Sequence, residues 1–588
     1  MAEKIIIVGG GLAGLMAAIK IAESGAKVDL FSMVPCKRSH SVCAQGGINA
    51  AVNTKGEGDS TWEHFDDTIY GGDFLANQTP VRSMIEAAPK IIDLMDRMGV
   101  TFNRTPEGFI DVRRLGGAKY SRTVFAGATT GQQLIYALDD QVRRYEDEGL
   151  VSRYEEWEFI SIVQDDEERC RGIVVQDLKS LEVKVFPADA VILATGGLGM
   201  IFGRSTNSTI NTGFAQSSVY QQGAIYANGE FIQIHPSAIP GRDKLRLMSE
   251  SIRGDGGRVW VYKDGKPWYF LEEWYPAYGN MVPRDIATRA IFKVCVDMKL
   301  GVDKENKVYL DISHLDPQDI KRKLSGVVDI YEKFVGVDPR KVPMQTFPAV
   351  HYSMGGLWVD YNQMTNISGL FAAGECEYQY HGANRLGGNS LVAAMYAGMV
   401  AGPKALEYAK GLPRSSAELS STLFETARRK EEEKTEEIFN RQGKENPYQL
   451  HQELGEWMLE NVTVVRYNDR LWATDEKILE LQERFHKIGV GNSPKCGNQI
   501  VPFTRRLWGM LSLSRVITLG ALHRNESRGA HYKPEYPERD DENWLKTTKA
   551  EYTPDGPRFS YEPVEMSFIK PRQRRYDVAK EVTMQNVK

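Results

Sequence analysis

The chain begins with the stretch that decides its fold: residues 4–22 read KIIIVGGGLAGLMAAIKIA. The β-branched run at 4–8 predicts a short buried strand, and residues 12–22 have the composition of a helix. Between them, three glycines fit the pattern G-x-G-x-x-G: Gly9, Gly11 and Gly14. Such glycines permit a tight turn and let backbone N–H groups approach a pyrophosphate at the helix N-terminus. The stretch therefore predicts a Rossmann-like α/β domain that binds a dinucleotide.

The following segments bear on which dinucleotide is bound. Residues 26–31 predict the second strand, and Ser32 stands at its end, where sites for NAD usually carry an acidic residue, while Asp29 lies inside the strand. Two more junctions between a strand and a glycine-rich turn follow, at 194–197 and 369–375. Three such turns in one chain favour a long ligand, contacted at several points. They favour FAD over NAD.

Changes in residue composition along the sequence predict how the chain is divided into domains. Strand-like and helical segments alternate to about residue 193, whereas residues 235–350 are richer in Trp, Tyr and Pro. After residue 369, glycine-rich turns between strand-like and helical segments occur again. We expect an α/β fold in which a Rossmann-like FAD-binding domain is interrupted by an α+β capping domain and followed by a helical domain and an extended C-terminal tail. The expected boundaries are 1–234 and 352–414 for the two parts of the FAD-binding domain, 235–351 for the cap, 415–525 for the helical domain and 526–588 for the C-terminal region.

Composition narrows the class of protein. Lys and Arg number 73 and Asp and Glu 78, so the net charge of −5 gives no argument for nucleic acid as a partner. The six cysteines contain no C-x-x-C pair, so we expect no zinc or iron–sulfur ligands and, because they are scattered, a reducing compartment. No uncharged apolar run reaches the roughly 18–20 residues of a membrane span. The apolar run at 5–19 is broken by glycines and precedes no small-residue cleavage site, so we expect neither a signal peptide nor a transit peptide.

Several further motifs then follow one another in a fixed order. They are RSHS at 38–41, AQGG at 44–47, HP at 235–236, SESIRG at 249–254, PRD at 283–285, HYSMGG at 351–356, HGANRLGGNSL at 381–391 and ESRGAH at 526–531. Together they resemble the flavoprotein subunit of succinate dehydrogenase and fumarate reductase over nearly the whole chain. The intervening EYQY at 377–380 is similar to the menaquinone-linked bacterial branch of that family.

The resemblance implies a covalent FAD, attached through the imidazole of His40. In this family the histidyl linkage makes the flavin a stronger oxidant, which suits the oxidation of an unactivated C–C bond. The other residues that the resemblance implies for the FAD site are Gly9, Gly11, Gly14, Ser32, Ser39, Gly46, Gly47, Glu375, Ser390 and Leu391.

The substrate implied by the resemblance is a C4 dicarboxylate, succinate or fumarate. Two carboxylates require a cation or a strong donor at each end, and Arg offers a bidentate fork. The resemblance assigns these contacts to His235, Ser249, His351 and Arg385. The family usually has Thr where this chain has Ser249, and the hydroxyl is retained.

The resemblance also implies the proton chemistry. Arg284 would be the catalytic acid/base, with Glu250 and Arg253 as a proton path to solvent. Glu250 and Arg253 are three residues apart and share a face if the segment is helical. Because these three residues belong to the expected cap, whereas His40 and Arg385 belong to the FAD-binding domain, we expect the active site between the two domains, with the cap excluding water.

The resulting hypothesis is the flavin subunit of a succinate:quinone oxidoreductase. Such a subunit passes electrons to a separate iron–sulfur subunit and, through it, to a membrane anchor with quinone, and lies peripherally at the cytoplasmic face of the bacterial membrane. A soluble fumarate reductase and an L-aspartate oxidase-like flavoenzyme are alternatives, although His40 argues against the oxidase, which binds FAD non-covalently. A non-catalytic FAD scaffold would have lost some of the implied charged residues, and a nucleic-acid-modifying flavoprotein would need a basic stripe. The direction of the reaction is left open.

Overall fold

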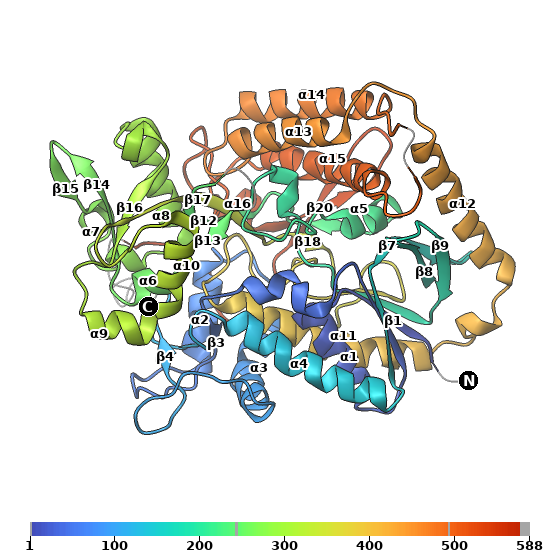
Figure 1. Ribbon diagram of the computed structural model, residues 1–588, viewed down its shortest axis with the longest axis horizontal. Coiled ribbons are helices and arrows are strands. Elements are labelled where there is room, and N and C mark those ends of the chain that lie inside the picture. The colour runs from blue at the N-terminus through green and yellow to red at the C-terminus, as the bar shows by residue number, and fades with distance from the viewer. Residues whose placement is uncertain (1–2, 242–244, 492–493, 577–588) are drawn as a thin grey trace.

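The computed structural model describes residues 3–241, 245–491 and 494–576. Figure 1 shows a first domain drawn in blue, cyan and gold, which corresponds to the expected FAD-binding domain, a green cap at one end, and a layer of orange and red helices across the top. The gold helix α11 (Asn389–Lys410) lies among the blue elements, so the chain returns to its first domain after the cap. The predicted fold class, an interrupted Rossmann-like domain with a helical domain after it, is confirmed.

A parallel sheet forms the centre of the FAD-binding domain. Its strand order is β19-β10-β1-β2-β6, and the bounds are β1 (Ile5–Val8), β2 (Val28–Ser32), β6 (Val151–Glu155), β10 (Ala190–Leu193) and β19 (Leu370–Ala372). Ile7 of β1 pairs with Ile192 on one side and Leu30 on the other. All four residues of β1 are buried, as is typical of a strand covered on both faces. The strands predicted from the opening sequence are confirmed.

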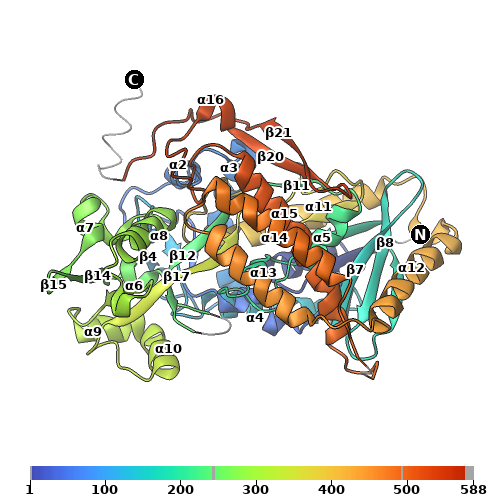
Figure 2. The ribbon, with the colours of Figure 1, turned by 90° about the horizontal axis from the view of Figure 1, so that it is seen from above.

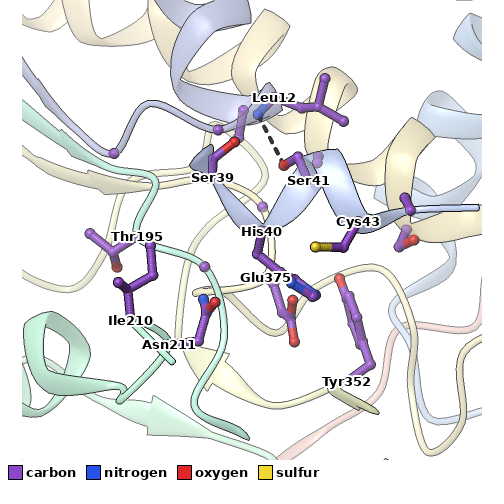
Figure 3. Close-up of a pocket in the computed structure, with 18 of the residues that line it drawn as sticks. Leu12, Ser39, His40, Ser41, Cys43, Thr195, Ile210, Asn211, Tyr352 and Glu375 are labelled. Carbon is purple, nitrogen blue, oxygen red and sulfur yellow. Dashed lines mark hydrogen bonds between the residues drawn. The ribbon is translucent and has the colours of Figure 1, made fainter. Parts of the chain in front are cut away.

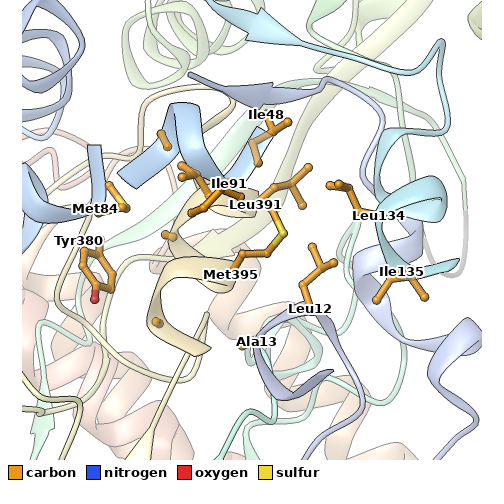
Figure 4. Packing of buried hydrophobic residues seen from close by; sticks show 14 of the residues in the cluster. Leu12, Ala13, Ile48, Met84, Ile91, Leu134, Ile135, Tyr380, Leu391 and Met395 are labelled. Carbon is orange, nitrogen blue, oxygen red and sulfur yellow. The ribbon is translucent and has the colours of Figure 1, made fainter. Parts of the chain in front are cut away.

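Helices cover the sheet and close the first core. The predicted helix is α1 (Leu12–Ala22), which packs against α11 and against α4 (Thr130–Asp147). The approach of α1 and α11 is close, since a Cβ at Gly398 would lie 2.3 Å from the carbonyl oxygen of Ala13. Figure 4 shows this packing, with Leu12, Leu134, Leu391 and Met395 gathered between the helices.

Smaller elements complete the FAD-binding domain. Helices α2 (Thr61–Gly71) and α3 (Gln78–Arg97) pack on each other, and α3 also packs on α11. An antiparallel sheet of β7 (Trp157–Gln164), β8 (Cys170–Asp177) and β9 (Val183–Pro187) follows β6 in the chain. A short three-stranded sheet is formed by β3 (Ile48–Asn49), β5 (Thr123–Val124) and β4 (Val112–Arg113).

The cap is built on an antiparallel sheet with the order β13-β12-β17-β16-β14-β15. The bounds are β12 (Ile232–Ile239), β13 (Arg246–Leu247), β14 (Arg258–Lys263), β15 (Lys266–Trp268), β16 (Val308–Asp311) and β17 (Met344–Ser353). The cap helices include α6 (Ser251–Gly254), α7 (Phe270–Trp274), α8 (Arg284–Phe292) and α10 (Ser325–Val335). The expected boundaries at 234/235 and 351/352 fall inside β12 and β17. These two paired strands connect the cap to the FAD-binding domain.

The last part of the chain is helical and then returns to strands. The helices are α12 (Ser421–Phe439), α13 (Pro447–Asn461), α14 (Asn468–Phe485) and α15 (Ile500–His523). After them, β20 (Lys546–Glu551) and β21 (Arg558–Pro563) join β11 (Tyr226–Ala227) and β18 (Gly356–Leu357) in one sheet. Residues 546–551 and 558–563 therefore form paired strands, where the Pro and charge content predicts an extended tail. None of the helices in the described ranges has the length and apolar character needed to cross a membrane.

Candidate functional site

A cavity of about 390 Å³ lies between the FAD-binding domain and the cap. The FAD-binding domain contributes the opening glycine turn, His40 and Glu375 to its lining, and the cap contributes Arg284 and Phe334. Its volume is in the range of sites that bind cofactors and small ligands. The domain interface is where the sequence places the active site.

The glycine turn forms one end of this cavity. Gly9 has φ +118°, and a Cβ there would lie 2.1 Å from the carbonyl oxygen of Ala194, so only glycine fits. Gly11 is the N-cap of α1 and provides no side-chain cap, and the N–H of Leu12 lies 3.4 Å from Ser41 Oγ. This helix N-terminus lines the cavity, where it can attract an anion. Gly14 was expected in the lining, but the structure places it behind the turn. A Cβ at Gly14 would lie 1.9 Å from the carbonyl oxygen of Gly9, so this glycine permits the close packing of helix and strand.

The structure brings the remaining residues of the expected FAD site to the lining: Gly9, Gly11, Ser32, Ser39, His40, Gly46, Gly47, Glu375, Ser390 and Leu391. At the end of β2, the hydroxyl of Ser32 donates to the carbonyl oxygen of Val34 at 2.8 Å. The oxygen of Ser32 therefore can accept a hydrogen bond from a ligand hydroxyl but does not donate one while this contact holds.

The lining fits a long polar ligand such as FAD. Ser39 Oγ, Gln45 Oε1 and Asn211 Oδ1 are buried and have no hydrogen-bond partner in the part of the chain that the structure describes. Buried polar atoms are normally paired, so these atoms suit contacts to a bound molecule. Figure 3 shows Ser39, Asn211 and Glu375 arranged around the same space as His40. Burial raises the pKa of Glu375 to about 7, which lets its carboxyl group either donate or accept a hydrogen bond near neutral pH.

A polar segment that the sequence analysis did not single out holds two of the expected site histidines. Asn207 Nδ2 lies 3.1 Å from His40 Nε2 and donates to the backbone oxygen of His351 at 3.0 Å. The backbone N–H of Ser208 donates to His40 Nδ1 at 3.2 Å, and Thr206 Oγ1 lies 2.7 Å from His351 Nδ1. The only signal in the sequence is a run of polar residues soon after a glycine-rich turn, a place where loops often carry function.

A buried cluster of charges forms the other end of the site. Glu250 Oε1 accepts from Arg253 Nη2 at 2.9 Å, and Glu250 Oε2 accepts from Arg284 Nη2 at 2.7 Å and from Arg284 Nε at 2.9 Å. Burial alone would raise the pKa of Glu250, but the charges of Arg284 and Arg253 outweigh it and lower that pKa. The carboxylate is thus connected to two guanidinium groups, which is a geometry that can pass a proton.

Gln233 links this cluster to Arg385. Gln233 Oε1 accepts from Arg284 Nη1 at 3.0 Å and from Arg385 Nη2 at 2.9 Å. Burial and the nearby charge of Arg284 lower the pKa of Arg385 to about 9. Sequence reasoning missed Gln233, although in a strand it shares a face with His235, two residues further on.

The two expected substrate histidines lie together. The ring centroids of His235 and His351 are 5.0 Å apart. Burial and the charge of Arg284 lower the pKa of both imidazoles well below the usual value, so both are neutral at pH 7. His235 Nε2 is buried and has no hydrogen-bond partner in the described residues.

The expected substrate and proton-path residues do not all reach the cavity wall. His351, Arg385 and Arg284 line the cavity, whereas His235, Glu250 and Arg253 lie behind these residues. Ser249 accepts hydrogen bonds from the hydroxyl and the backbone N–H of Ser251, at 2.8 and 3.2 Å. The structure does not bring Ser249 to the lining. Across the described residues, no group of three or more His, Cys, Asp or Glu side chains could hold a metal ion.

The fold and this cavity define a class of protein, the flavin-dependent enzymes with a Rossmann-like domain and an inserted cap. In agreement, the chain matches the family model described as "FAD binding domain" over residues 4–391 and that described as "Fumarate reductase flavoprotein C-term" over 451–576. The predicted FAD-binding domain is therefore confirmed.

The matches to individual proteins extend over nearly the full length. The chain is 68% identical to the succinate dehydrogenase flavoprotein subunit of Bacillus subtilis (strain 168) over 580 residues, 98% of this chain and 99% of that protein. A solved structure of E. coli quinol fumarate reductase aligns with a TM-score of 0.92 at 32% identity, covering 98% of this chain and 99% of that one. A solved quinol-fumarate reductase with menaquinol molecules aligns with a TM-score of 0.89 at 33% identity, covering 97% and 100%. The chain belongs to the family of succinate dehydrogenase and fumarate reductase flavoproteins, and the resemblance found in its motifs is confirmed.

Proposed function

We propose that this chain is the catalytic flavoprotein subunit of a succinate:quinone oxidoreductase and interconverts succinate and fumarate. The observation that carries the proposal is the hydrogen-bonded row Arg253–Glu250–Arg284, which reaches the same cavity as the glycine turn and His40. The relatives named as a succinate dehydrogenase and as fumarate reductases support the substrate pair. The cap, which we propose to span 235–351, separates this site from solvent.

We propose that FAD is held by the residues expected for it, with His40 as the covalent attachment. Bound FAD supplies the acceptor and donor of two electrons for the reaction. The backbone N–H groups at the start of α1 would hold its pyrophosphate, and Glu375 and Ser32 would contact its hydroxyl groups. Ser39, Gly46, Gly47, Ser390 and Leu391 complete the lining, and Gly14 supports the turn from behind.

The substrate is a dianion, and Arg385 is the buried cation that would bind one carboxylate bidentately. The neutral imidazoles of His235 and His351 are hydrogen-bonding groups for the other carboxylate. Ser249 belongs to this set by family resemblance, and its hydroxyl oxygen accepts a hydrogen bond from the hydroxyl of Ser251. A site with one binding cation and neutral partners holds a dicarboxylate without a large excess of buried positive charge.

Arg284 would exchange the proton at one methylene carbon while a hydride leaves the neighbouring carbon. Arginine is protonated in ordinary surroundings, so a proton can leave it only if a receiving group is in contact. Glu250 provides that contact, and Arg253 extends it away from the cavity by donating to the backbone oxygen of Asn280 at 2.7 Å. We propose this row as the proton path.

We propose that electrons leave through a separate iron–sulfur subunit, and through it reach a membrane anchor with quinone. The support is that the Bacillus relative is named as a subunit and that the solved neighbours are quinol enzymes, one with menaquinol. The complex would lie peripherally at the cytoplasmic face of the bacterial membrane. The motif at 377–380 resembles the menaquinone-linked branch, and the type of quinone is left open.

The test is to purify the complex from native membranes with its partners and to assay both succinate oxidation and fumarate reduction. Arg284→Lys should lower kcat about 10³-fold, in the range of general acid–base catalysis, with covalent flavin retained. Arg258→Lys is the matched control, because Arg258 is a cap arginine that pairs with Glu272 near the surface. Inactivity of the wild-type complex in both directions would refute the proposed function, and normal turnover of Arg284→Lys would refute the acid/base assignment. A denatured protein band without flavin fluorescence would favour the soluble or oxidase-like alternatives.

A further inference from the structure

The last described stretch of the chain, residues 564–576, connects the two domains that enclose the site. We call this stretch the C-terminal strap. Figure 2 shows the chain beyond β21 passing α2 on its way toward the green cap. Neither the FAD site nor the substrate site described above includes any residue of the strap.

One part of the strap is attached to the FAD-binding domain. Arg572 Nη2 lies 2.8 Å from both carboxylate oxygens of Asp66 on α2. The side chain of Gln78 on α3 donates to the backbone oxygen of Ile569 and accepts from its backbone N–H, at 2.7 and 2.8 Å. The backbone N–H of Arg575 donates to Tyr70 Oη at 2.6 Å. These contacts fix the strap on the surface of α2 and α3.

The end of the strap is attached to the cap. Arg574 Nη1 and Nη2 donate to the two carboxylate oxygens of Asp285, at 2.6 and 3.0 Å. Both side chains are buried, with 6% and 2% of their surface exposed. Arg574 Nε also donates to Tyr576 Oη at 3.1 Å, and the ring of Tyr576 packs edge-on against that of Tyr278 in the cap, with centroids 5.2 Å apart.

Arg574 also lies close to a carboxylate of the FAD-binding domain. Its Nη1 is 3.7 Å from Asp73 Oδ2, just beyond the end of α2. Burial alone would lower the pKa of Arg574, but the charges of Asp285 and Asp73 raise it well above the usual value, so the guanidinium stays charged. A single buried cation is therefore shared between a carboxylate of the cap and one of the FAD-binding domain. Asp285 also accepts from Arg289 Nη2 at 3.3 Å, and Asp73 accepts from Arg539 Nη1 at 2.8 Å. Moving the cap would separate Arg574 from its bidentate partner Asp285 and leave it only the longer contact to Asp73, which is costly for a buried charge.

The position of Asp285 gives this contact its functional meaning. Asp285 is the second residue of α8, and Arg284 is the first. The fork of two parallel hydrogen bonds to Asp285 fixes the first turn of α8 in both direction and rotation. From that turn Arg284 reaches Glu250 and Gln233.

We propose that Arg574 is a positioning residue for the succinate/fumarate reaction: by clamping Asp285 between the two domains, it holds Arg284 at the cavity. The proposal rests on the proposed role of Arg284 and adds a part of the chain that lies outside the site. Arg574 acts through Asp285 and touches neither substrate nor cofactor. Without the clamp, the first turn of α8 could shift, and a misplacement of about 1 Å in a catalytic group costs about 100-fold in rate.

The test compares Arg574→Gln with Arg572→Gln in the complete membrane complex. The two variants remove the same charge from the same strap, but the ion pair of Arg572 in the described residues is with Asp66 of the FAD-binding domain and not with the cap. We expect Arg574→Gln to lower kcat about 10- to 100-fold, with covalent flavin content and succinate KM within about threefold of wild type, and Arg572→Gln to stay within about threefold in kcat. Equal losses in both variants would show that the strap only stabilises the fold, and would overturn the proposal. A normal kcat in Arg574→Gln would overturn it as well.

Two further variants keep the outcome decisive. If Arg574→Gln does not assemble, Arg574→Lys retains the charge but lacks the bidentate fork, so kcat should still fall by more than about threefold, and an unchanged kcat refutes the proposal. Arg284→Lys, assayed in parallel, separates the proposed catalytic role of Arg284 from the proposed positioning role of Arg574. Normal turnover in Arg284→Lys would refute the catalytic role of Arg284, on which the proposed role of Arg574 depends. An inactive Arg284→Lys beside a normal Arg574→Gln would overturn the clamp alone.

Discussion

The two ends of the cavity use different parts of the polypeptide. The end beside the parallel sheet is built mainly from backbone, at turns such as Gly9 and Gly47, with few charged groups. The end beneath the cap is built from buried charged side chains, with Glu250 between Arg253 and Arg284. Backbone N–H groups suit a fixed pyrophosphate, whereas a reaction that moves a proton needs groups that titrate. The contrast predicts that damage at one end removes the cofactor and damage at the other removes the chemistry.

The most far-reaching effect is expected at the backbone end, because it removes the cofactor on which all of the chemistry depends. In Gly14→Ala, the new Cβ would lie 1.9 Å from the carbonyl oxygen of Gly9, and because that oxygen is backbone, the turn must move. Such overpacking at the turn should reduce the flavin bound per protein to about a tenth or less, as measured by absorbance and by fluorescence of the denatured band. Gly411→Ala, at the end of α11, is the control, since the nearest atom to its Cβ is 3.5 Å away. Full flavin content in Gly14→Ala would contradict the prediction that the backbone end of the cavity holds the cofactor.

The next effect is at the charged end. In Glu250→Gln the side chain keeps its shape but no longer accepts a proton, so kcat should fall about 10²- to 10³-fold while covalent flavin is retained. Glu272→Gln provides the control, because Glu272 pairs with Arg258 in the same cap and is partly exposed. Succinate oxidation and flavin content are measured on the same preparations. Loss of flavin together with activity would show that the two ends are not separable in function.

The smallest expected effect is a dependence on pH. The pKa of Arg385 is lowered to about 9, so the guanidinium is charged below that pH and loses its proton as the pH rises through it. Since the charged form binds the substrate carboxylate, kcat/KM for succinate should fall about tenfold per pH unit above about 9, while flavin binding does not change. The pH profile of kcat/KM tests this. A flat profile up to pH 10 would show that Arg385 stays charged or does not bind the substrate.

The sequence predicted one end of the cavity better than the other. The turn at Gly9, the strand before it and the helix after it are local in sequence, and the structure has all three elements where they were expected. The packing of Gly14 against Gly9 could not be read from the motif, which shows that a glycine is required but not on which side of the turn the space is limited. Only the measured approach to the oxygen of Gly9 decides that.

The charged end could be predicted only through the resemblance to a known family. Glu250, Arg284 and Arg385 lie on separate segments, and nothing in their spacing says that they share hydrogen bonds. Gln233, which bridges Arg284 and Arg385, and Asn207, which contacts His40, belong to no motif that the sequence analysis used. A neutral side chain that positions charged ones is visible only once its partners are placed.

The sequence by itself determined the Rossmann-like start, the interruption by a cap and the family. Each of these depends on short-range patterns, such as β-branched runs, glycine spacing and an ordered set of motifs. The tertiary structure alone decided which groups meet across the domain boundary: the row from Arg253 to Arg284, the segment that contacts both His40 and His351, and the strap whose Arg574 reaches Asp285. The physical reason is that buried polar groups must find partners wherever the folded chain provides them, and Arg574 and Asp285, for example, lie 289 residues apart in sequence.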